Sequence, residues 1–214
     1  MPLIYLLYRC PRCGHDPMDG EKDVAICPGC GVQFFRGGEG GLIRTQDPDG
    51  EIWDVPGHRL TAAMEAWGEE ETLPDPTASD LPIRQAQVEV RQSGAEAPVE
   101  WGGELLGFAE AMGEPAAGVL ELNREELVLR TPPGKPGFGG RKPRESWSLL
   151  DLRAVQTSSS SLQFSPSSGG LVQLRFSNDS PFRWEALLRG ALRAIYREQG
   201  LGEIVEFQPR IVAE

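Results

Sequence analysis

Histidine is scarce in this sequence, and long apolar runs are missing from it. Its 214 residues include only two histidines, His15 and His58. No stretch approaches the roughly 20 consecutive apolar residues that cross a bilayer as a helix. Gly20 and Ala63 stand where the H-x4-D motif of acyltransferases has its aspartate. The sequence therefore predicts neither a membrane-spanning helix nor that acyltransferase centre.

Other catalytic signatures are lacking as well. The chain has no G-x-S-x-G elbow and no H-E-x-x-H helix. The glycine-rich segments "RGGEGG" and "GKPGFGG" do not fit a nucleotide-binding loop, because Lys135 is followed by Pro136 rather than by Ser or Thr. Acidic residues are plentiful, but no pair of them is singled out by an apolar setting. We therefore expect a protein that is not an enzyme.

Positive charge is in deficit and unevenly spread. The chain has 21 Lys and Arg against 32 Asp and Glu, a net charge of -11. Residues 1–80 carry a net charge of -9, residues 81–133 carry -5, and residues 134–214 carry +3. Phosphates are repelled by the first two of these segments, which excludes a general polyanion binder. Any anion-binding surface is expected in the C-terminal part.

The opening segment "MPLIYLLY" is apolar but short. It is too short for the core of a signal peptide and has no basic leader. We interpret it as a buried strand. The expected location is the cytoplasm, and a peripheral contact with a membrane stays open.

Four cysteines form the strongest motif of the chain. Cys10 and Cys13 lie in "CPRCG", and Cys27 and Cys30 lie in "CPGCG". Two residues between the cysteines let both thiolates face one centre from a tight turn, and the following glycine lets the backbone close. Two such turns supply four soft ligands for a tetrahedral metal ion. The spacing therefore predicts a metal site, with Zn²⁺ as the expected ion and iron as the alternative.

Other uses of the four thiols fit the sequence less well. Two disulfides suit an exported protein, and a redox dithiol needs one C-x2-C pair at a strand–helix junction. Four thiolate ligands also close the metal shell, which leaves no position for water or substrate. The metal is therefore expected to be structural, and His15 to be surplus to it.

The two CPxCG knuckles, followed by the strand-like segments "GLIRTQ" and "EIWDV", resemble a zinc ribbon over about residues 5–56. Zinc ribbons bind nucleic acids, other proteins or only their own chain. The acidic charge of this segment argues against nucleic acid. The resemblance therefore implies a docking role or a purely structural one.

The chain divides into two predicted domains. The first covers residues 1–68 and ends in a short helix with Leu60 and Met64 on its apolar face. The segment "EEETLPDPTASDLP", residues 69–82, is interpreted as a linker because its prolines cannot sustain a helix or a sheet ladder. The second domain covers residues 83–214.

The second domain has the pattern of a β domain with one helix at its end. Alternating segments such as "QAQVEV", "GVLEL" and "LVQLRF" predict strands. Ser180 is suited to cap a helix over residues 181–199, whose apolar residues recur every three or four positions and include Trp184. Gly200 is suited to end it, and "EIVEFQPRIV" is expected to be extended. The predicted fold class is mainly β.

The segments "GVLELNREELVLRT" and "SWSLLDLRAV", together with the helix that follows, resemble a pleckstrin-homology (PH) or GRAM-type domain. The resemblance implies a bent sheet or small barrel closed by a C-terminal helix. In that family a loop between strands grips anionic head groups through basic residues. This chain departs from the family because its basic loop follows the second or third strand rather than the first. In "GKPGFGGRKPR" the residues that match this pattern are Lys135, Lys142 and Arg144, and Arg141 is the fourth candidate anion-binding residue of the loop.

The ending "SPFRWEALLRGALRAIYREQGLGEIVEFQPRI" is similar to non-catalytic tails of some bacterial lysophospholipid acyltransferases. That similarity implies an accessory module for membrane-lipid chemistry. We expect an adaptor that contacts a protein partner and an anionic membrane surface. The alternative is a nucleic-acid-associated zinc-ribbon protein of the transcription or translation apparatus.

Overall fold

Contacts between Cα atoms divide the chain into two units. The first unit comprises Met1–Leu73 with Asp179–Gly190, and the second comprises Pro74–Asn178 with Ala191–Glu214. The predicted domains differ from this division, because they placed the whole C-terminal helix in the second. The structure is a computed structural model. It describes residues 2–37, 41–69, 82–132, 143–157 and 161–202.

The first unit is built on a five-stranded antiparallel sheet whose strands follow chain order. The hairpin expected from "GLIRTQ" and "EIWDV" is confirmed. Its turn is closed by the Gly50 N–H, which donates to the Asp47 carbonyl at 2.9 Å, and Gly50 has a φ of +86° that favours glycine. The strands are β1 (Asp19–Glu21), β2 (Val24–Ile26), β3 (Gln33–Arg36), β4 (Leu42–Gln46) and β5 (Ile52–Pro56).

One face of this sheet forms the core of the first unit. The register places Ala25, Phe34 and Thr45 side by side on β2, β3 and β4. All three are buried. Because strand side chains alternate between faces, the residues before and after them lie on the outer face.

The opening segment is buried as expected, but the predicted strand is wrong. It forms the one-turn helix α1 (Leu3–Leu6), in which the Leu7 N–H donates to the Leu3 carbonyl at 2.8 Å. A run of apolar residues is compatible with a buried strand or a buried helix, so its burial did not decide between them. Leu3 and Leu7 are both fully buried, since a spacing of four places them on one side of the turn.

Helix α2 (Gly57–Glu69) follows β5 directly, where a short helix was predicted. Leu60 and Met64 are buried, as their spacing indicated. They join a core cluster that also contains Phe34 and two of the cysteines, Cys10 and Cys27. Two of the four cysteines are therefore part of the apolar interior of this unit.

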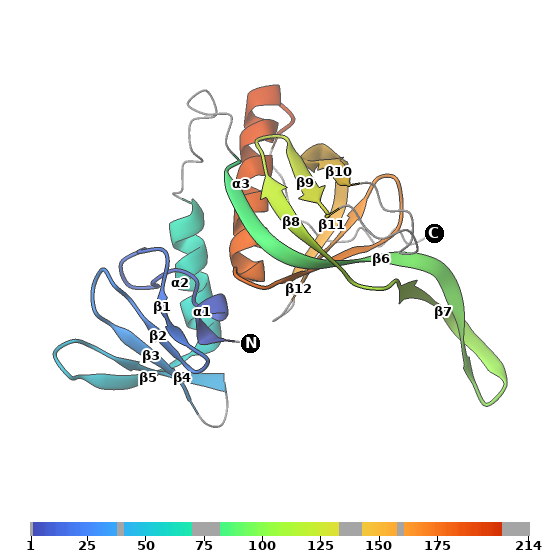
Figure 1. Cartoon of the computed structure of the whole chain (residues 1–214). Helices are drawn as coiled ribbons and strands as arrows, with labels where there is room; N and C mark the ends of the chain where they lie inside the picture. Colours follow the sequence, from blue (N-terminus) through green and yellow to red (C-terminus); the bar gives the residue numbers. More distant parts are fainter. Residues whose placement is uncertain (1, 38–40, 70–81, 133–142, 158–160, 203–214) are drawn as a thin grey trace. The chain divides into compact units, whose positions relative to one another are not determined.

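The second unit is an antiparallel sheet that curls into a half-barrel (Figure 1). Its strand order is β10-β9-β8-β6-β13-β12-β11. The curl is evident from Trp147 on β10 and Phe164 on β12, because their rings meet edge to face at 5.1 Å although four strands separate them in the order. The strands are β6 (Arg84–Trp101), β8 (Ala116–Leu122), β9 (Glu126–Arg130), β10 (Arg144–Ser148), β11 (Leu152–Thr157), β12 (Ser161–Pro166) and β13 (Val172–Phe176).

The sequence pattern did not predict two features of this unit. Strand β6 runs on past the sheet and pairs with β7 (Glu104–Met112) as a two-stranded arm. The segment "SWSLLDLRAV" is divided by the 3-10 turn η2 (Leu149–Asp151), which separates β10 from β11. Buried Leu149 anchors that turn in the core.

Helix α3 (Pro181–Gln199) has the predicted bounds. Its cap is confirmed, since the Arg183 N–H donates to Ser180 Oγ at 3.3 Å. Its end is confirmed too, since Gly200 has a φ of +65° and the Leu201 N–H donates to the Tyr196 carbonyl at 2.9 Å. The tail that was expected to be extended lies outside the described residues.

Candidate metal centre

The four cysteines sit in two loops of the first unit. The first knuckle (residues 10–14) lies between α1 and β1, and the second knuckle (residues 27–31) joins β2 to β3. Each ends in a glycine of positive φ, +72° at Gly14 and +73° at Gly31. Residues with a side chain rarely adopt that conformation, which explains the glycine after each cysteine pair.

The two knuckles share one hydrogen-bond pattern. The Gly14 N–H donates to the Cys10 carbonyl, and the Gly31 N–H donates to the Cys27 carbonyl, both at 2.9 Å. The first cysteine of each knuckle then donates its own N–H to the residue after the glycine, at 2.8 and 2.9 Å. The same sequence thus folds the same way twice, and each copy brings two sulfurs to one side.

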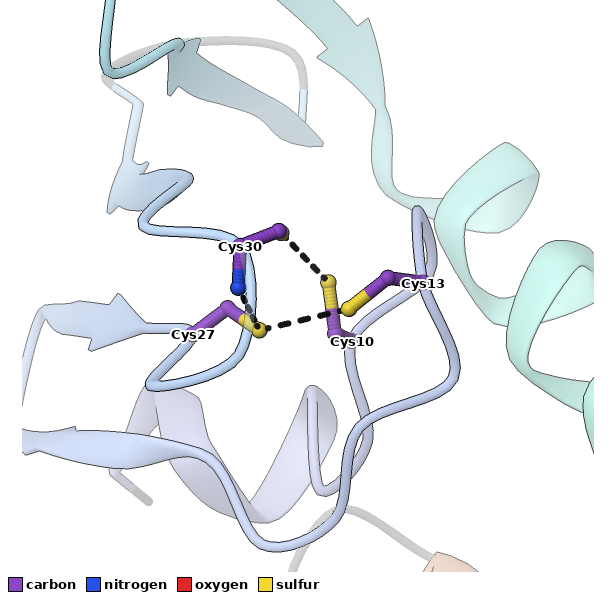
Figure 2. Close-up of side chains that lie close together, drawn as sticks. All are labelled: Cys10, Cys13, Cys27 and Cys30. Atoms are coloured by element: carbon purple, nitrogen blue, oxygen red, sulfur yellow. Dashed lines mark hydrogen bonds between the residues drawn. The ribbon is translucent and has the colours of Figure 1, made fainter.

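The copies face each other (Figure 2). Sγ of Cys10 lies 3.7 Å from Sγ of Cys30, and Sγ of Cys13 lies 3.5 Å from Sγ of Cys27. All four sulfurs lie within 4.8 Å of one another. Four sulfurs at about 2.3 Å from a central zinc ion stand about 3.8 Å apart. The spacing therefore fits a tetrahedral metal shell, and these four close cysteines could hold a metal ion.

On balance, burial opposes the thiolate form at two of the four cysteines. Burial raises the pKa of Cys10 and that of Cys30. Burial also opposes ionisation of Cys27, but the N–H of Cys30, which donates to its sulfur at 3.4 Å, and the neighbouring thiols bring the pKa of Cys27 below its ordinary value. A divalent cation supplies the positive charge that four converging thiolates need.

Next to the cluster, one ion pair ties the first knuckle to the β4–β5 turn. Arg12 Nη1 lies 2.6 Å from Asp47 Oδ2, and that carboxylate raises the pKa of Arg12. His15 is exposed and lies against the second knuckle, where an added Cβ on Gly29 would meet its ring at 3.0 Å. It does not belong to the cluster of four ligands.

A second polar cluster lies at the start of α3, and no sequence motif predicted it. Asp179 and Arg183 are 3% and 8% exposed. Arg183 Nη1 donates to Asp179 Oδ1 at 2.8 Å, and its Nη2 donates to the Tyr8 carbonyl at 2.8 Å and to Asp16 Oδ1. The guanidinium also lies 5.3 Å from the centroid of the Tyr8 ring. One buried cation therefore ties the helix start to the chain on both sides of the first knuckle.

Two more hydrogen bonds complete this cluster. Trp184 Nε1 donates to Asp179 Oδ2 at 3.0 Å, and Ser180 Oγ donates to the Tyr5 carbonyl. The sequence identified Ser180 as a cap and Trp184 as one of the apolar residues of the helix, but their hydrogen-bond partners lie far away in the chain or depend on tertiary packing. No spacing rule could have linked Asp16 to Arg183, because 167 positions separate them.

The basic loop is only partly within the described residues. Lys135, Arg141 and Lys142 lie outside them. Arg144 lies on β10, is exposed, and has Nη2 3.3 Å from Glu126 Oε1 on β9. The structure thus places one of the four predicted anion-binding residues, and places it beside a carboxylate.

Comparisons with known proteins add no family. No protein-family model matches the chain, and no curated protein matches it. Among the described residues, no helix is both long enough and apolar enough to cross a membrane.

Proposed function

We propose that this chain is an adaptor without catalytic activity, in which a structural Zn²⁺ holds the first unit together and the second unit contacts an anionic membrane surface. The adaptor joins that surface to a protein partner. The observation that carries the proposal is the cluster of four convergent cysteine sulfurs.

The donor set supports zinc and a structural role. Cysteine thiolates are the preferred ligands of structural zinc, and a shell of four leaves no position for a substrate. Cys10, Cys13, Cys27 and Cys30 would hold the ion, which supplies cross-linking between the two knuckles. Binding of such an ion is coupled to folding, because the site does not pre-exist in the unfolded chain.

The second unit supports the membrane part of the proposal through its architecture. A curled sheet followed by one helix is the arrangement that a PH- or GRAM-like domain implies. Its basic loop would supply Lys135, Arg141 and Lys142 to phosphate oxygens, and Arg144 would exchange its exposed pair with Glu126 for a lipid phosphate. An exposed ion pair contributes about 0–1 kcal/mol, so that exchange costs little.

Elemental analysis tests the metal. The full chain, purified without chelator, is expected to carry zinc in equimolar amount, and His15→Ala is expected to keep it. A chain with two disulfides and no metal would overturn the proposal. A coloured chain with stoichiometric iron would show that the structural ion is iron, the alternative, and not zinc.

A further inference from the structure

The outer edge of the first unit's sheet is open in the described part of the chain. Strand β5 is the last strand of the order β1-β2-β3-β4-β5 and pairs with β4 alone. The opposite edge, β1, is a short polar strand of Asp, Gly and Glu. In contrast, β5 exposes Ile52 and Trp53 by 57% and 39%. Of the two edges of this sheet, β5 is therefore the one that offers apolar side chains together with backbone groups that no other described strand pairs with.

The phase of the hydrogen bonds shows which backbone groups point outward. The Asp47 N–H donates to the Glu51 carbonyl at 2.9 Å. In an antiparallel ladder the bonded pairs recur at every second residue, so Trp53 bonds to β4 while Ile52 and Asp54 direct their N–H and C=O groups away from it. Such a row is a template for an additional strand.

Side chains along β5 define what that strand would carry. Alternation places Ile52 and Asp54 on one face, and Glu51 and Trp53 on the other. All four are exposed. A strand laid beside them meets the order acid, apolar, apolar, acid. Its complement reads basic, apolar, apolar, basic, and it reads the same in both directions.

A second copy of the chain does not provide that complement. Its β5 edge carries two acids, Glu51 and Asp54, and no base, so pairing two such edges brings like charges together without a compensating cation. The net charge of -11 adds to this repulsion. The exposed pair between Asp54 and Arg44, at 3.3 Å, is weak enough to be exchanged for a partner's cation.

We infer that β5 is a docking edge for an extended segment of a partner protein whose sequence reads basic–apolar–apolar–basic, added as a sixth strand. The inference rests on the adaptor function proposed above, since it specifies the protein partner of the first unit. It involves neither the basic loop nor a metal ligand.

Two synthetic peptides test the pattern against the full, metal-loaded chain. One has the centre Lys-Ile-Val-Lys, and the other has the same composition in the inverted order Ile-Lys-Lys-Val. The first is expected to bind about tenfold more tightly, because the second loses several favourable cross-strand pairs together. Amide signals of Ile52 and Asp54 should shift on binding and gain protection from exchange. Equal affinity of the two peptides, or shifts confined to other strands, would overturn the inference.

A matched pair of variants tests the edge itself. Asp54→Pro removes one outward N–H without touching the ladder to β4, and should abolish binding. Asp54→Asn keeps the N–H, so the affinity for the first peptide should fall by no more than a few fold, the contribution of one exposed charge pair. Binding that survives Asp54→Pro would contradict strand addition. If that variant does not fold, the comparison of the two peptides still tests the inference. Unchanged zinc content distinguishes failure of this inference from failure of the metal site.

Discussion

The two units are both built on antiparallel sheets, yet their interiors differ in kind. The core of the first unit is small and includes Cys10 and Cys27 among its buried side chains. The sheet of the second unit is larger, and most of its buried residues are leucines, valines and aromatic residues such as Trp147 and Phe164. A small unit buries too little apolar surface to offset its chain entropy without an additional cross-link. The comparison teaches that the two units should respond to different perturbations.

Removing one ligand should have the largest effect. Cys27→Ser leaves three thiols, and metal binding that contributes on the order of 10 kcal/mol to folding should be largely lost. Amide signals of residues 2–69 should collapse toward unfolded positions in a heteronuclear NMR spectrum, while those of the curled sheet keep their dispersion. Loss of both sets of signals together would break the comparison, because it would make the units one cooperative block.

Arg183→Met should come next. It removes the cation from a buried cluster, so that the Asp179 carboxylate, at 2% side-chain exposure, loses the guanidinium 2.8 Å away. Breaking a buried pair in this way costs about 3–5 kcal/mol. Calorimetry should show a lower unfolding temperature for the first unit. Arg189→Met is the matched control, because Arg189 and Glu185 form a partly exposed i,i+4 pair on the same helix, which contributes less than about 0.5 kcal/mol.

Leu120→Ala probes the second interior. Leu120 is fully buried in the middle of β8, and its truncation should destabilise the second unit by about 2–5 kcal/mol. Zinc content should remain unchanged. Leu150→Ala, at a side chain that is 43% exposed, serves as the control and should have little effect. A fall in zinc content of Leu120→Ala would show that the metal site depends on the second core.

The smallest effect on stability is expected at the basic loop. Reversing Lys142 and Arg144 to Glu should abolish co-sedimentation with anionic vesicles at low salt, since each cation near an acidic leaflet contributes about 1 kcal/mol. The melting temperature should hardly change. The same charge reversal at the exposed residues Arg175 and Arg197 should leave co-sedimentation largely intact. An unaltered chain that ignores anionic and neutral vesicles alike would remove the membrane from the proposed function.

Local signals predicted much of this structure. The duplicated CPxCG spacing identified four side chains that converge, because a knuckle is fixed by its own backbone bonds. The bounds of α3 followed from Ser180, the apolar period and Gly200, all of which are local. The strand predicted for the opening segment was wrong because a short buried run of apolar residues is compatible with a strand and with a helix alike. The bonds of Arg183 were out of reach, since they depend on tertiary placement of residues far apart in sequence.

The position of Arg183 also bears on synthesis of the protein. Asp16 and the Tyr8 carbonyl leave the ribosome early, but the guanidinium that they receive is encoded 167 positions after Asp16. At about 5–20 residues per second, the N-terminal segment waits roughly ten to thirty seconds for it. During that interval the knuckles can bind their metal. The bound metal can still exchange with ions in solution, because the surrounding chain does not yet have its bonds to Arg183. Nascent chains that stop before Asp179 should therefore hold zinc less firmly than the released protein.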